Sequence, residues 1–420
     1  MIKFRKMLAI ILAAIMCVSL VACAKGNTGE SGTSGTVTGS ESGQATVDNT
    51  SDVTGDTTTE ATEEPTKSGG ILMPDEPDRS TINSIIPGRI TVDGTNFVVN
   101  GEVVFMNGAN VPWNKWNDFG NGYVDSFWRR HFAELHENGI NSVRVWISCD
   151  GTKAMALDDD GNFIAATPKH WQDLDKLFAA AEENGIYIMA TLMSFDHFKD
   201  SNLNSAKWRK MLNSDEAMDS YINNYLIPFC KRYGSYESLW SIDLCNEPDW
   251  INENSECGKL PWSKITKFFA KEAAAIHENS DILVTVGFGM IKYNSTMYSG
   301  NYGSDKQFSL VYKNDNAYLD FYSTHFYEWE AQWYGFPFDK TPEAFGLDGT
   351  KPVVLGEFPA TGMDGSKPNS IAMSGSECYV NLYNNGWNGA FAWTSNGVDG
   401  CGSLEDFVEG AREVAGLDKE

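Results

Sequence analysis

Two glutamates stand in nearly the same local setting, each directly after an apolar run and close to a proline. Glu247 follows residues 239–245 within the stretch LWSIDLCNEPDW, and Glu357 ends the stretch KPVVLGE. A carboxylate held against apolar walls has a raised pKa, as a general acid working near neutral pH requires. A strand that ends in a helix-capping Asn-Glu-Pro turn is the alternative interpretation of the first stretch.

Pro248 constrains the backbone at the first glutamate. Proline restricts the residue before it to extended geometry, so we expect the strand to stop at Glu247 and to present Asn246 and Glu247 together. If Glu357 ends another strand of a parallel barrel, the two carboxylates face each other across its mouth. A separation of about 5–5.5 Å suits double displacement at a sugar carbon, whereas inversion of configuration requires a wider gap.

The chain around these groups alternates short apolar runs with helical patterns, which is typical of repeated βα units. Strands are predicted at residues 105–111, 142–147, 187–192, 239–245, 282–286, 319–323, 352–356 and 389–392. Helices are predicted at residues 125–138, 168–184, 215–233, 261–279, 369–385 and 404–414. The pattern predicts an α/β fold, a (β/α)8 TIM barrel, with an N-terminal β-hairpin at residues 90–105 that closes the bottom of the barrel.

The first 81 residues differ in composition from the rest. A basic start and a short apolar run end in Leu-Val-Ala-Cys23, which resembles the lipobox of a bacterial lipoprotein signal peptide at residues 1–23. An ordinary signal peptide with an incidental cysteine is the alternative. Residues 24–81 are rich in Ser, Thr, Gly and Glu and predict a disordered linker, because they cannot bury enough apolar surface to fold. The folded domain is then expected at residues 82–420.

Charge and composition narrow the class of partner. The 420 residues carry 57 acidic and 32 basic side chains, a formal net charge of −25. Phosphates repel such a chain, so nucleic acid and anionic membrane surfaces are poor partners. The only membrane contact expected is the lipid on Cys23. The six cysteines after the leader show no zinc-type spacing, and Cys245 in the buried run is expected to be a free core thiol.

Four features together resemble glycoside hydrolase family 5, in clan A of the retaining glycosidases. They are Asn246-Glu247-Pro248, Glu357 at the end of a Val-Val-Leu-Gly-Glu strand, Arg144 in the second strand, and His325-Phe-Tyr327 after the sixth strand. The resemblance covers residues 90–420. Each motif is weak alone, and their order and strand placement carry the resemblance.

The resemblance implies a role for each matching residue. Glu247 would be the acid/base and Glu357 the nucleophile. Asn246 would hydrogen-bond the sugar 2-OH, Arg144 would keep the nucleophile ionised, and Tyr327 would donate a hydrogen bond to it.

Further contacts are expected around these groups. His325 would line the same wall, and Trp393 after the eighth strand would be the platform beneath the sugar at the cleavage point. A salt bridge inside the barrel for Arg144 and core packing for His325 and Trp393 are the structural alternatives. Weaker candidates for substrate contacts follow the first and third strands: Trp113, Asn114, Asp196 and His197. The turn-like run Asp158-Asp-Asp-Gly161 lacks the remaining ligands of a calcium loop.

These features predict a retaining endo-β-1,4-glycanase that hydrolyses plant cell-wall polysaccharide. Similarity to bacterial mannanases favours β-mannan as the substrate, and β-1,4-glucan is the alternative. A glycan-binding lipoprotein without catalysis is a third hypothesis, opposed by the presence of both glutamates with their surrounding set. No metal or cofactor is expected, because the six histidines include no HxH pair. We expect a lipid-anchored, extracytoplasmic monomer.

Overall fold

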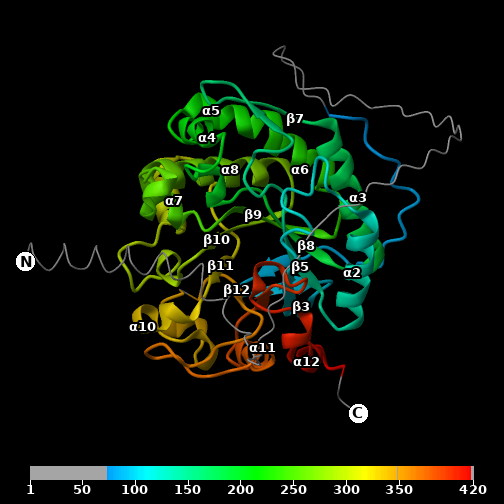
Figure 1. Ribbon diagram of the computed structural model, residues 1–420, viewed down its shortest axis with the longest axis vertical. Coiled ribbons are helices and arrows are strands. Elements are labelled where there is room, and N and C mark those ends of the chain that lie inside the picture. Colours follow the sequence, from blue (N-terminus) through cyan, green and yellow to red (C-terminus); the bar gives the residue numbers. More distant parts are fainter. Residues whose placement is uncertain (1–72, 348, 418–420) are drawn as a thin grey trace, which may run out of the picture. The chain divides into compact units, whose positions relative to one another are not determined.

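The structure is a computed structural model that describes residues 73–347 and 349–417. The predicted signal peptide, Cys23 and the linker up to residue 72 lie outside the described residues. Eight parallel strands close into a barrel in the order β10-β11-β12-β13-β4-β5-β8-β9 (Figure 1). Their bounds are Met106–Asn110 (β4), Ser142–Trp146 (β5), Tyr187–Thr191 (β8), Leu239–Asn246 (β9), Leu283–Phe288 (β10), Tyr322–His325 (β11), Val353–Pro359 (β12) and Gly389–Trp393 (β13). The predicted TIM barrel is confirmed.

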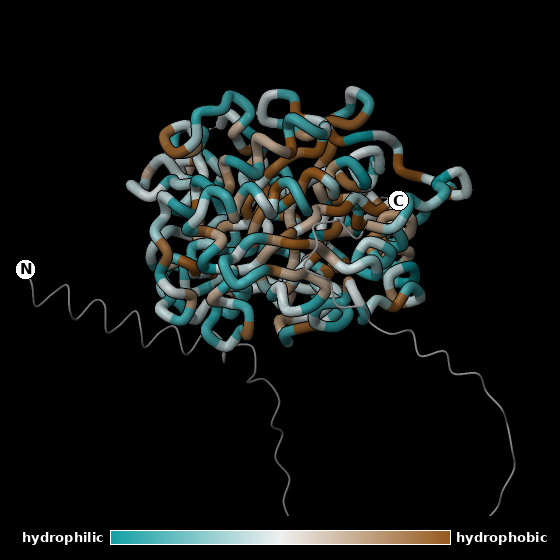
Figure 2. The backbone as a smooth tube through the Cα atoms, turned by 90° about the horizontal axis from the view of Figure 1, so that it is seen from above, coloured by the Kyte–Doolittle hydropathy of each residue, from teal (hydrophilic) through white to brown (hydrophobic). Residues whose placement is uncertain are grey.

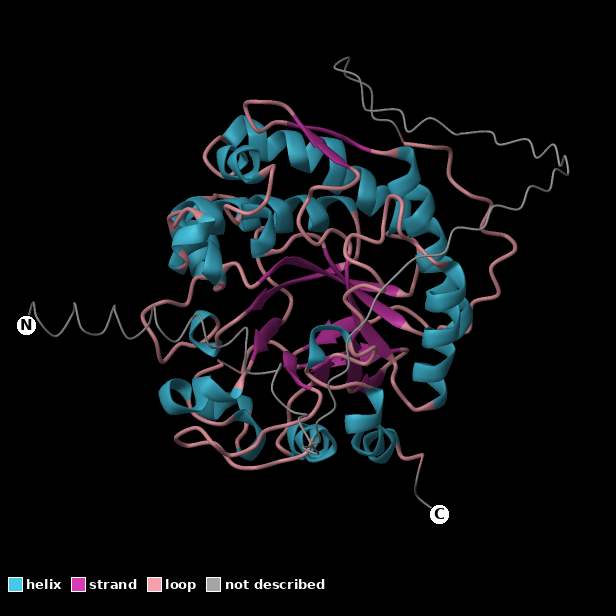
Figure 3. Cartoon of the chain, viewed as in Figure 1, coloured by secondary structure: helices cyan, strands magenta, loops and turns pink. Residues whose placement is uncertain are grey.

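Helices surround the strands, as Figure 3 shows. The longer ones are α2 (Asp125–Glu137), α3 (Pro168–Asn184), α8 (Trp262–Asn279), α11 (Gly375–Asn384) and α12 (Leu404–Ala415). The predicted helix at residues 215–233 is α5 (Asp215–Tyr221) and α6 (Ile227–Tyr233), joined by a π-helical turn. Local signals set these boundaries. In α3, for example, Thr167 accepts a hydrogen bond from the His170 N–H, and Gly185 ends the helix at φ +68°.

The barrel strands are buried along almost their whole length because one face points into the barrel and the other lies under the helices. Every residue of β5, β8, β9 and β10 is buried. Figure 2 shows the same arrangement, with the hydrophobic stretches gathered in the interior of the folded domain. Cys245 in β9 is a buried free thiol, as predicted.

A small antiparallel sheet closes the N-terminal end of the barrel. It contains β1 (Thr91–Asp93), β2 (Asn96–Val99) and β3 (Glu102–Val104), so the predicted single hairpin is two hairpins in succession. Phe97 of β2 meets Trp240 and Phe321 edge-on, with ring centroids 5.2 and 5.1 Å away. These contacts fill the bottom of the barrel with apolar side chains.

Several elements differ from the prediction. The sixth strand is Tyr322–His325, not residues 319–323, and α11 begins at Gly375, not at residue 369. A hairpin of β6 (Met155–Leu157) and β7 (Phe163–Ala166) was not predicted; the run Asp158–Gly161 makes its turn. Shorter helices also follow several strands: α4 (Ser205–Met211), α7 (Asp249–Glu253), α9 (Asp305–Val311) and α10 (Ala331–Tyr334).

The folded part of the chain starts earlier than residue 82. The carbonyls of Pro74 and Asp75 accept hydrogen bonds from the buried Arg232 at 2.9 and 3.0 Å. The guanidinium of Arg79 lies over the ring of Tyr236, 4.2 Å from its centroid. Residues 74–79 therefore pack on the barrel, although composition assigned them to the linker. Within residues 73–347 and 349–417, no helix combines the length and apolar character that crossing a membrane requires.

Candidate active site

Strands β9 and β12 bring the two glutamates together at the C-terminal end of the barrel. Glu247 directly follows β9, and Glu357 lies within β12. One oxygen of each carboxylate and Nδ1 of His325 all lie within 4.8 Å of one another. This spacing matches the short separation used in double displacement and is shorter than inversion requires.

The backbone at Glu247 is left-handed, with φ +45°, and not extended as Pro248 led us to expect. The Glu247 N–H donates to the carbonyl of Gly287 at 2.7 Å, where the β9–β10 register shifts. A left-handed conformation is costly for a residue with a side chain, and such strain is held where the surrounding structure fixes it. Here the turn ends the strand at Asn246 and directs the Glu247 carboxylate toward Glu357.

Arg144 of β5 links the two sides of the site. Its Nη1 donates to Glu357 Oε1 at 2.7 Å, and its Nη2 donates to the Asn246 side-chain oxygen at 2.8 Å. Its Nε and Nη2 donate to Asp243 Oδ2 at 2.9 and 2.7 Å, and Nη1 also reaches the Asn110 side-chain oxygen at 3.2 Å. Arg144 therefore lies beside Glu357, as predicted. It also forms a salt bridge with Asp243 inside the barrel, which was the structural alternative.

Glu357 is almost fully buried and is held by donors on both oxygens. Arg144 binds Oε1, and the Tyr327 hydroxyl donates to Oε2 at 3.1 Å. Burial raises the pKa of Glu357 above its ordinary value, while His325, Arg144 and the hydrogen bond from Tyr327 pull it down. These three groups stabilise the ionised form that a nucleophile needs.

Glu247 is held by two different donors. The indole Nε1 of Trp250 lies 2.8 Å from Oε2, and Nδ1 of His325 lies 3.1 Å from Oε1. Burial opposes ionisation of Glu247, but the hydrogen bonds from His325 and Trp250 outweigh it and hold its pKa below the ordinary value. The raised pKa expected from the apolar setting of Glu247 is therefore corrected, because these donors stabilise the charged form. Both donors are positioned to stabilise the carboxylate that is left after proton donation.

His325 lies between the two glutamates. Its Nδ1 is 3.1 Å from Glu247 and 3.5 Å from Glu357, so it can bond either one. Within the described chain its buried Nε2 has no hydrogen-bond partner. The two carboxylates repel each other, and the charge of Glu247 adds to the burial that raises the pKa of Glu357.

Asn246 and Trp393 are the remaining predicted contacts of the reacting sugar. Because the Asn246 oxygen accepts from Arg144, its NH₂ group is the part left for a sugar hydroxyl. Trp393 ends β13 and lies in an aromatic cluster apart from the main core. Its ring centroid is 5.9 Å from that of Trp113 and 5.7 Å from that of Trp146.

The family follows from a comparison over most of the barrel. The family model described as Cellulase (glycosyl hydrolase family 5) matches residues 104–397, which include both glutamates and the residues around them. The chain belongs to glycosyl hydrolase family 5. It is a glycoside hydrolase of the (β/α)8 type.

Named relatives cover most of the same region. A mannan endo-1,4-β-mannosidase of Cryptopygus antarcticus is 26% identical over 341 residues, which are 74% of this chain and 86% of that protein. One of Mytilus edulis is 26% identical over 337 residues, covering 74% and 89%. The solved β-1,4-mannanase of Aplysia kurodai superposes with a TM-score of 0.67 at 25% identity, covering 78% of this chain and 96% of that one.

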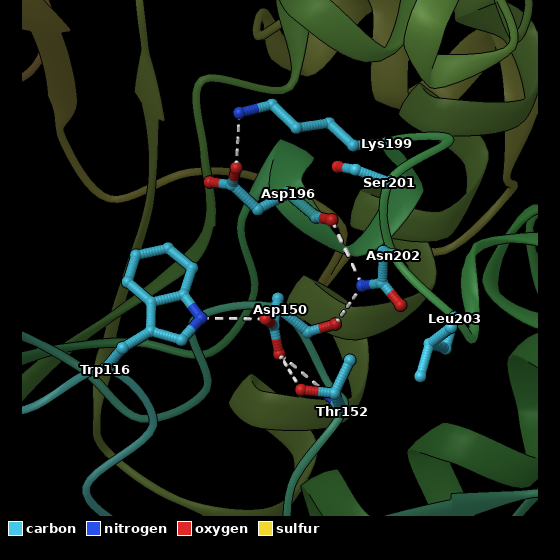
Figure 4. Close-up of a pocket in the computed structure, with 8 residues that line it drawn as sticks. All are labelled: Trp116, Asp150, Thr152, Asp196, Lys199, Ser201, Asn202 and Leu203. Carbon is cyan, nitrogen blue, oxygen red and sulfur yellow. Dashed lines mark hydrogen bonds and ion pairs between the residues drawn. The ribbon is translucent and has the colours of Figure 1, made fainter.

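The four weaker candidates for substrate contacts, Trp113, Asn114, Asp196 and His197, lie in different surroundings. The Trp113 ring lies in the aromatic cluster, and Asp196 lines a nearby hollow (Figure 4). The Asn114 N–H donates to Asp118 at 2.6 Å, and this contact holds the loop after β4. His197 is fully buried; its Nδ1 contacts Ser194 and its Nε2 contacts the hydroxyl of Ser148 at 3.1 Å. The expectation that His197 contacts substrate is therefore corrected, because its ring fixes the loop instead.

Two residues of the site were not identified from the sequence. Asp243 was not among the predicted site residues, yet its carboxylate accepts two hydrogen bonds from Arg144 inside the barrel. The available signal was that a charge inside an apolar strand needs an opposite charge, and Arg144 is such a charge. Trp250 was not among the predicted site residues either, and its indole Nε1 donates to Glu247.

The donor trio of Glu247, His325 and Glu357 has the composition of a small metal site. Its electrostatics do not suit a cation, because the Arg144 guanidinium lies 2.7 Å from Glu357 and donors from Tyr327 and Trp250 already bind carboxylate oxygens. The arrangement is suited to proton and glycosyl transfer by side chains.

Proposed function

We propose that this chain is a retaining endo-β-1,4-mannosidase that hydrolyses the backbone of plant β-mannan. The observation that carries the proposal is the approach of Glu247 and Glu357 within 4.8 Å, with a separate set of donors on each carboxylate. A protein that only binds glycans has no use for this arrangement. The relatives named above, mannan endo-1,4-β-mannosidases that the chain covers over 86% and 89% of their length, support mannan as the substrate.

In the first step Glu357 attacks the anomeric carbon, and a carboxylate–C1 bond forms as the bond to the glycosidic oxygen breaks. Glu247 gives its proton to that oxygen, so the leaving chain departs as a neutral alcohol. Trp250 and His325 then stabilise the Glu247 carboxylate. Arg144 and Tyr327 hold the nucleophile in position before the attack.

In the second step Glu247 acts as a base. It removes a proton from a water molecule, the oxygen of that water attacks C1, and the ester bond to Glu357 breaks. Two inversions at C1 leave the product with the configuration of the substrate. The Asn246 NH₂ group would bind the 2-OH, a contact that strengthens as positive charge develops at the ring. Mannose carries its 2-OH axially, so this contact is also where mannose and glucose differ.

The substrate is tested by release of reducing sugar from linear mannan, glucomannan, galactomannan, carboxymethyl cellulose and xylan. We expect the highest kcat/KM on linear mannan or glucomannan, and a β-anomer as the first product seen by NMR. Faster hydrolysis of carboxymethyl cellulose than of mannan would assign the chain as an endo-β-1,4-glucanase instead. An α-anomer as first product would exclude double displacement.

We also propose that the enzyme is a lipoprotein held outside the cytoplasm by lipid on Cys23. The lipobox-like Leu-Val-Ala-Cys23 and the acidic run after it support an anchor followed by a tether, which gives the catalytic domain reach toward an insoluble polymer. Cys23→Ser should move the protein from the membrane fraction to the medium of a bacterial host. Unchanged partitioning into detergent would contradict the anchor while leaving the hydrolase assignment intact.

A further inference from the structure

Asp249 is a buried carboxyl just after the acid/base in the chain, and no step of the reaction uses it. It is the first residue of α7, and its side chain is fully buried. Aspartate is seldom buried to this degree unless a group of opposite charge is paired with it. The position of Asp249 behind Glu247 therefore calls for a reason.

One oxygen of Asp249 ties the start of α7 to the end of β10. Its Oδ1 accepts a hydrogen bond from the Gly289 N–H at 2.9 Å. The Glu247 N–H donates to the Gly287 carbonyl at 2.7 Å, so both ends of the segment 247–249 are fastened to the end of β10. The left-handed backbone of Glu247 is costly, and these two contacts hold the turn in that conformation.

The second oxygen of Asp249 faces the Glu247 side chain. This oxygen, Oδ2, is buried and has no hydrogen-bond partner among the described residues. A Cβ added to Gly289 would lie 2.9 Å from Asp249 Oδ2 and 3.0 Å from the Glu247 carboxyl carbon. The two carboxyl groups therefore pack against the same side of Gly289, where a residue with a side chain would displace them.

The surroundings of Asp249 disfavour a negative charge. Lys292 follows Gly289 closely in the chain, but it forms its ion pair with Glu253, at 2.8 Å. A buried carboxylate with one backbone donor and a second carboxylate beside it is strongly destabilised. Burial and the charge of Glu247 accordingly raise the pKa of Asp249 well above its ordinary value. Since Oδ1 accepts from Gly289, the retained proton lies on Oδ2.

The other titratable groups near this carboxyl add to the cost of charging it. Glu330 is likewise fully buried, with Oε1 bound to the Tyr327 N–H at 3.0 Å and burial raising its pKa. The groups that face Asp249 are Glu247, Glu253, Glu330, Tyr293 and Cys245. The groups that face Glu247 from other elements are His325, Arg144, Glu357, Tyr327 and Glu330. The groups around Asp249 itself are acidic or uncharged, so none of them favours its ionised form.

An uncharged Asp249 matters for proton transfer at Glu247. A negative neighbour would repel the carboxylate that Glu247 becomes after it has given up its proton. An uncharged carboxyl adds no such repulsion, and its O–H group can turn toward the charge as it forms. Glu247 can then both give and take up a proton in one turnover.

We propose that Asp249 is a positioning residue for the acid/base: an uncharged carboxyl whose Oδ1 fixes the turn at Glu247 and whose protonated Oδ2 faces the Glu247 carboxyl without repelling it. Asp249 acts through Glu247 and touches neither the substrate nor the reacting atoms. The inference rests on the proposed function, because it requires Glu247 to be the acid/base. Changes at Asp249 should therefore affect proton transfer more than substrate binding.

Asp249→Ala removes both the anchor and the uncharged carboxyl. On mannan, whose leaving group needs a proton, we expect kcat to fall about 10²-fold with little change in KM. Formation of the glycosyl-enzyme from an activated aryl β-mannobioside, measured as a burst of released phenol, should fall less than about fivefold. Asp249→Asn keeps the shape, the Oδ1 acceptor and the lack of charge, so it should recover most of the lost activity.

Asp305→Ala is the matched control. Asp305 begins α9 as Asp249 begins α7, but it is half exposed and pairs with Lys351 at 2.6 Å. Its loss should leave activity on both kinds of substrate unchanged. Equal losses on mannan and on the activated glycoside in Asp249→Ala, or no rescue in Asp249→Asn, would overturn the inference.

The pH profile of Asp249→Asn reports the charge of Asp249 and does not depend on the folding of the alanine variant. Because Glu247 must be protonated in the first step, its ionisation sets the alkaline limb of kcat/KM. We expect this limb to stay in place. If Asp249 were ionised, removing its charge would lower the pKa of Glu247 and move the limb down by about one pH unit, which would overturn the inference. If Glu247→Ala itself showed no dependence on the leaving group, the acid/base assignment would fail instead.

Discussion

Asp243 holds Arg144 from inside the barrel, with Nε and Nη2 of the guanidinium 2.9 and 2.7 Å from one carboxylate oxygen. Both side chains are fully buried. Desolvation offsets most of the attraction in such a pair, so it adds little net stability. Its effect is geometric, because two donors fixed on Asp243 leave Nη1 directed at Glu357, 2.7 Å away.

Asp243→Asn should therefore reduce kcat about 10²-fold with little change in KM, because the amide holds the guanidinium less firmly and the nucleophile shifts. Steady-state kinetics on linear mannan measure the effect. Thr191→Val is the control, since it removes one neutral donor to Asp243, at 3.0 Å, and leaves Arg144 paired. A raised KM at unchanged kcat would mean that Asp243 supports binding rather than the nucleophile.

Alanine variants of the two glutamates distinguish their roles, because the roles depend differently on the leaving group of the substrate. Glu247→Ala should lose most activity on mannan, yet still form the glycosyl-enzyme from activated aryl glycosides, because such leaving groups need no proton. Glu357→Ala should abolish turnover of both. Added azide should then give a glycosyl azide of retained configuration with Glu247→Ala and of inverted configuration with Glu357→Ala. The reverse pattern would exchange the two roles.

Tyr327→Phe tests the electrostatics of the nucleophile. The Tyr327 hydroxyl donates to Glu357 and lowers its pKa, against the burial that raises it. Without this hydrogen bond the pKa of Glu357 rises, and the enzyme loses its ionised nucleophile at a higher pH. The acidic limb of the kcat/KM profile should move up by about one pH unit. Tyr383→Phe on α11 should leave the limb in place, and a downward shift for Tyr327→Phe would contradict the assignment.

The barrel could be predicted from the sequence because its strands are short apolar runs that end at polar residues. The sixth strand was misplaced because Leu319 and Phe321 extend the apolar pattern. Both are buried, but Phe321 precedes the ladder and stacks on Trp240 at 5.0 Å. Burial in the bottom of the barrel and pairing in a strand give the same sequence pattern.

Other differences have one local and one distant cause. The start of α11 is set locally, because Ser374 and Glu377 form a capping box that the sequence itself contains. The left-handed backbone of Glu247 could not be predicted from local sequence signals. It depends on the bond to Gly287 in the next strand, which overrides the local preference before proline.

Gly287→Ala should destabilise the protein and inactivate it. A Cβ at this position would lie 2.8 Å from Arg144 Nη2 and 2.9 Å from Asp243 Oδ2, so the buried ion pair would have to move. We expect a loss of about 1–3 kcal/mol in the free energy of unfolding, together with a large fall in kcat. Gly300→Ala is the control, because its new Cβ would meet nothing closer than 3.6 Å. Full activity in Gly287→Ala would show that the site tolerates displacement of Arg144.

Glu272 of α8 is a buried carboxyl whose two oxygens have no hydrogen-bond partner in the described part of the chain. Burial raises its pKa well above the ordinary value of 4.5. Above pH 4.5 the unfolded chain releases this proton while the folded chain retains it, so the group lowers stability increasingly as the pH rises toward the folded-state pKa. Glu272→Met should therefore raise the free energy of unfolding by about 1–3 kcal/mol at pH 7, because it replaces an unpaired polar group with an apolar one of similar length.

Urea denaturation of wild type and Glu272→Met between pH 4.5 and 8 measures this difference. The gain should shrink as the pH falls toward 4.5, because the unfolded wild-type chain then takes up the proton that the folded chain already holds. The exposed Glu216→Met on α5 should show no such trend. A gain that grows on acidification would mean that Glu272 is ionised in the folded protein, with its charge balanced by a group outside α8.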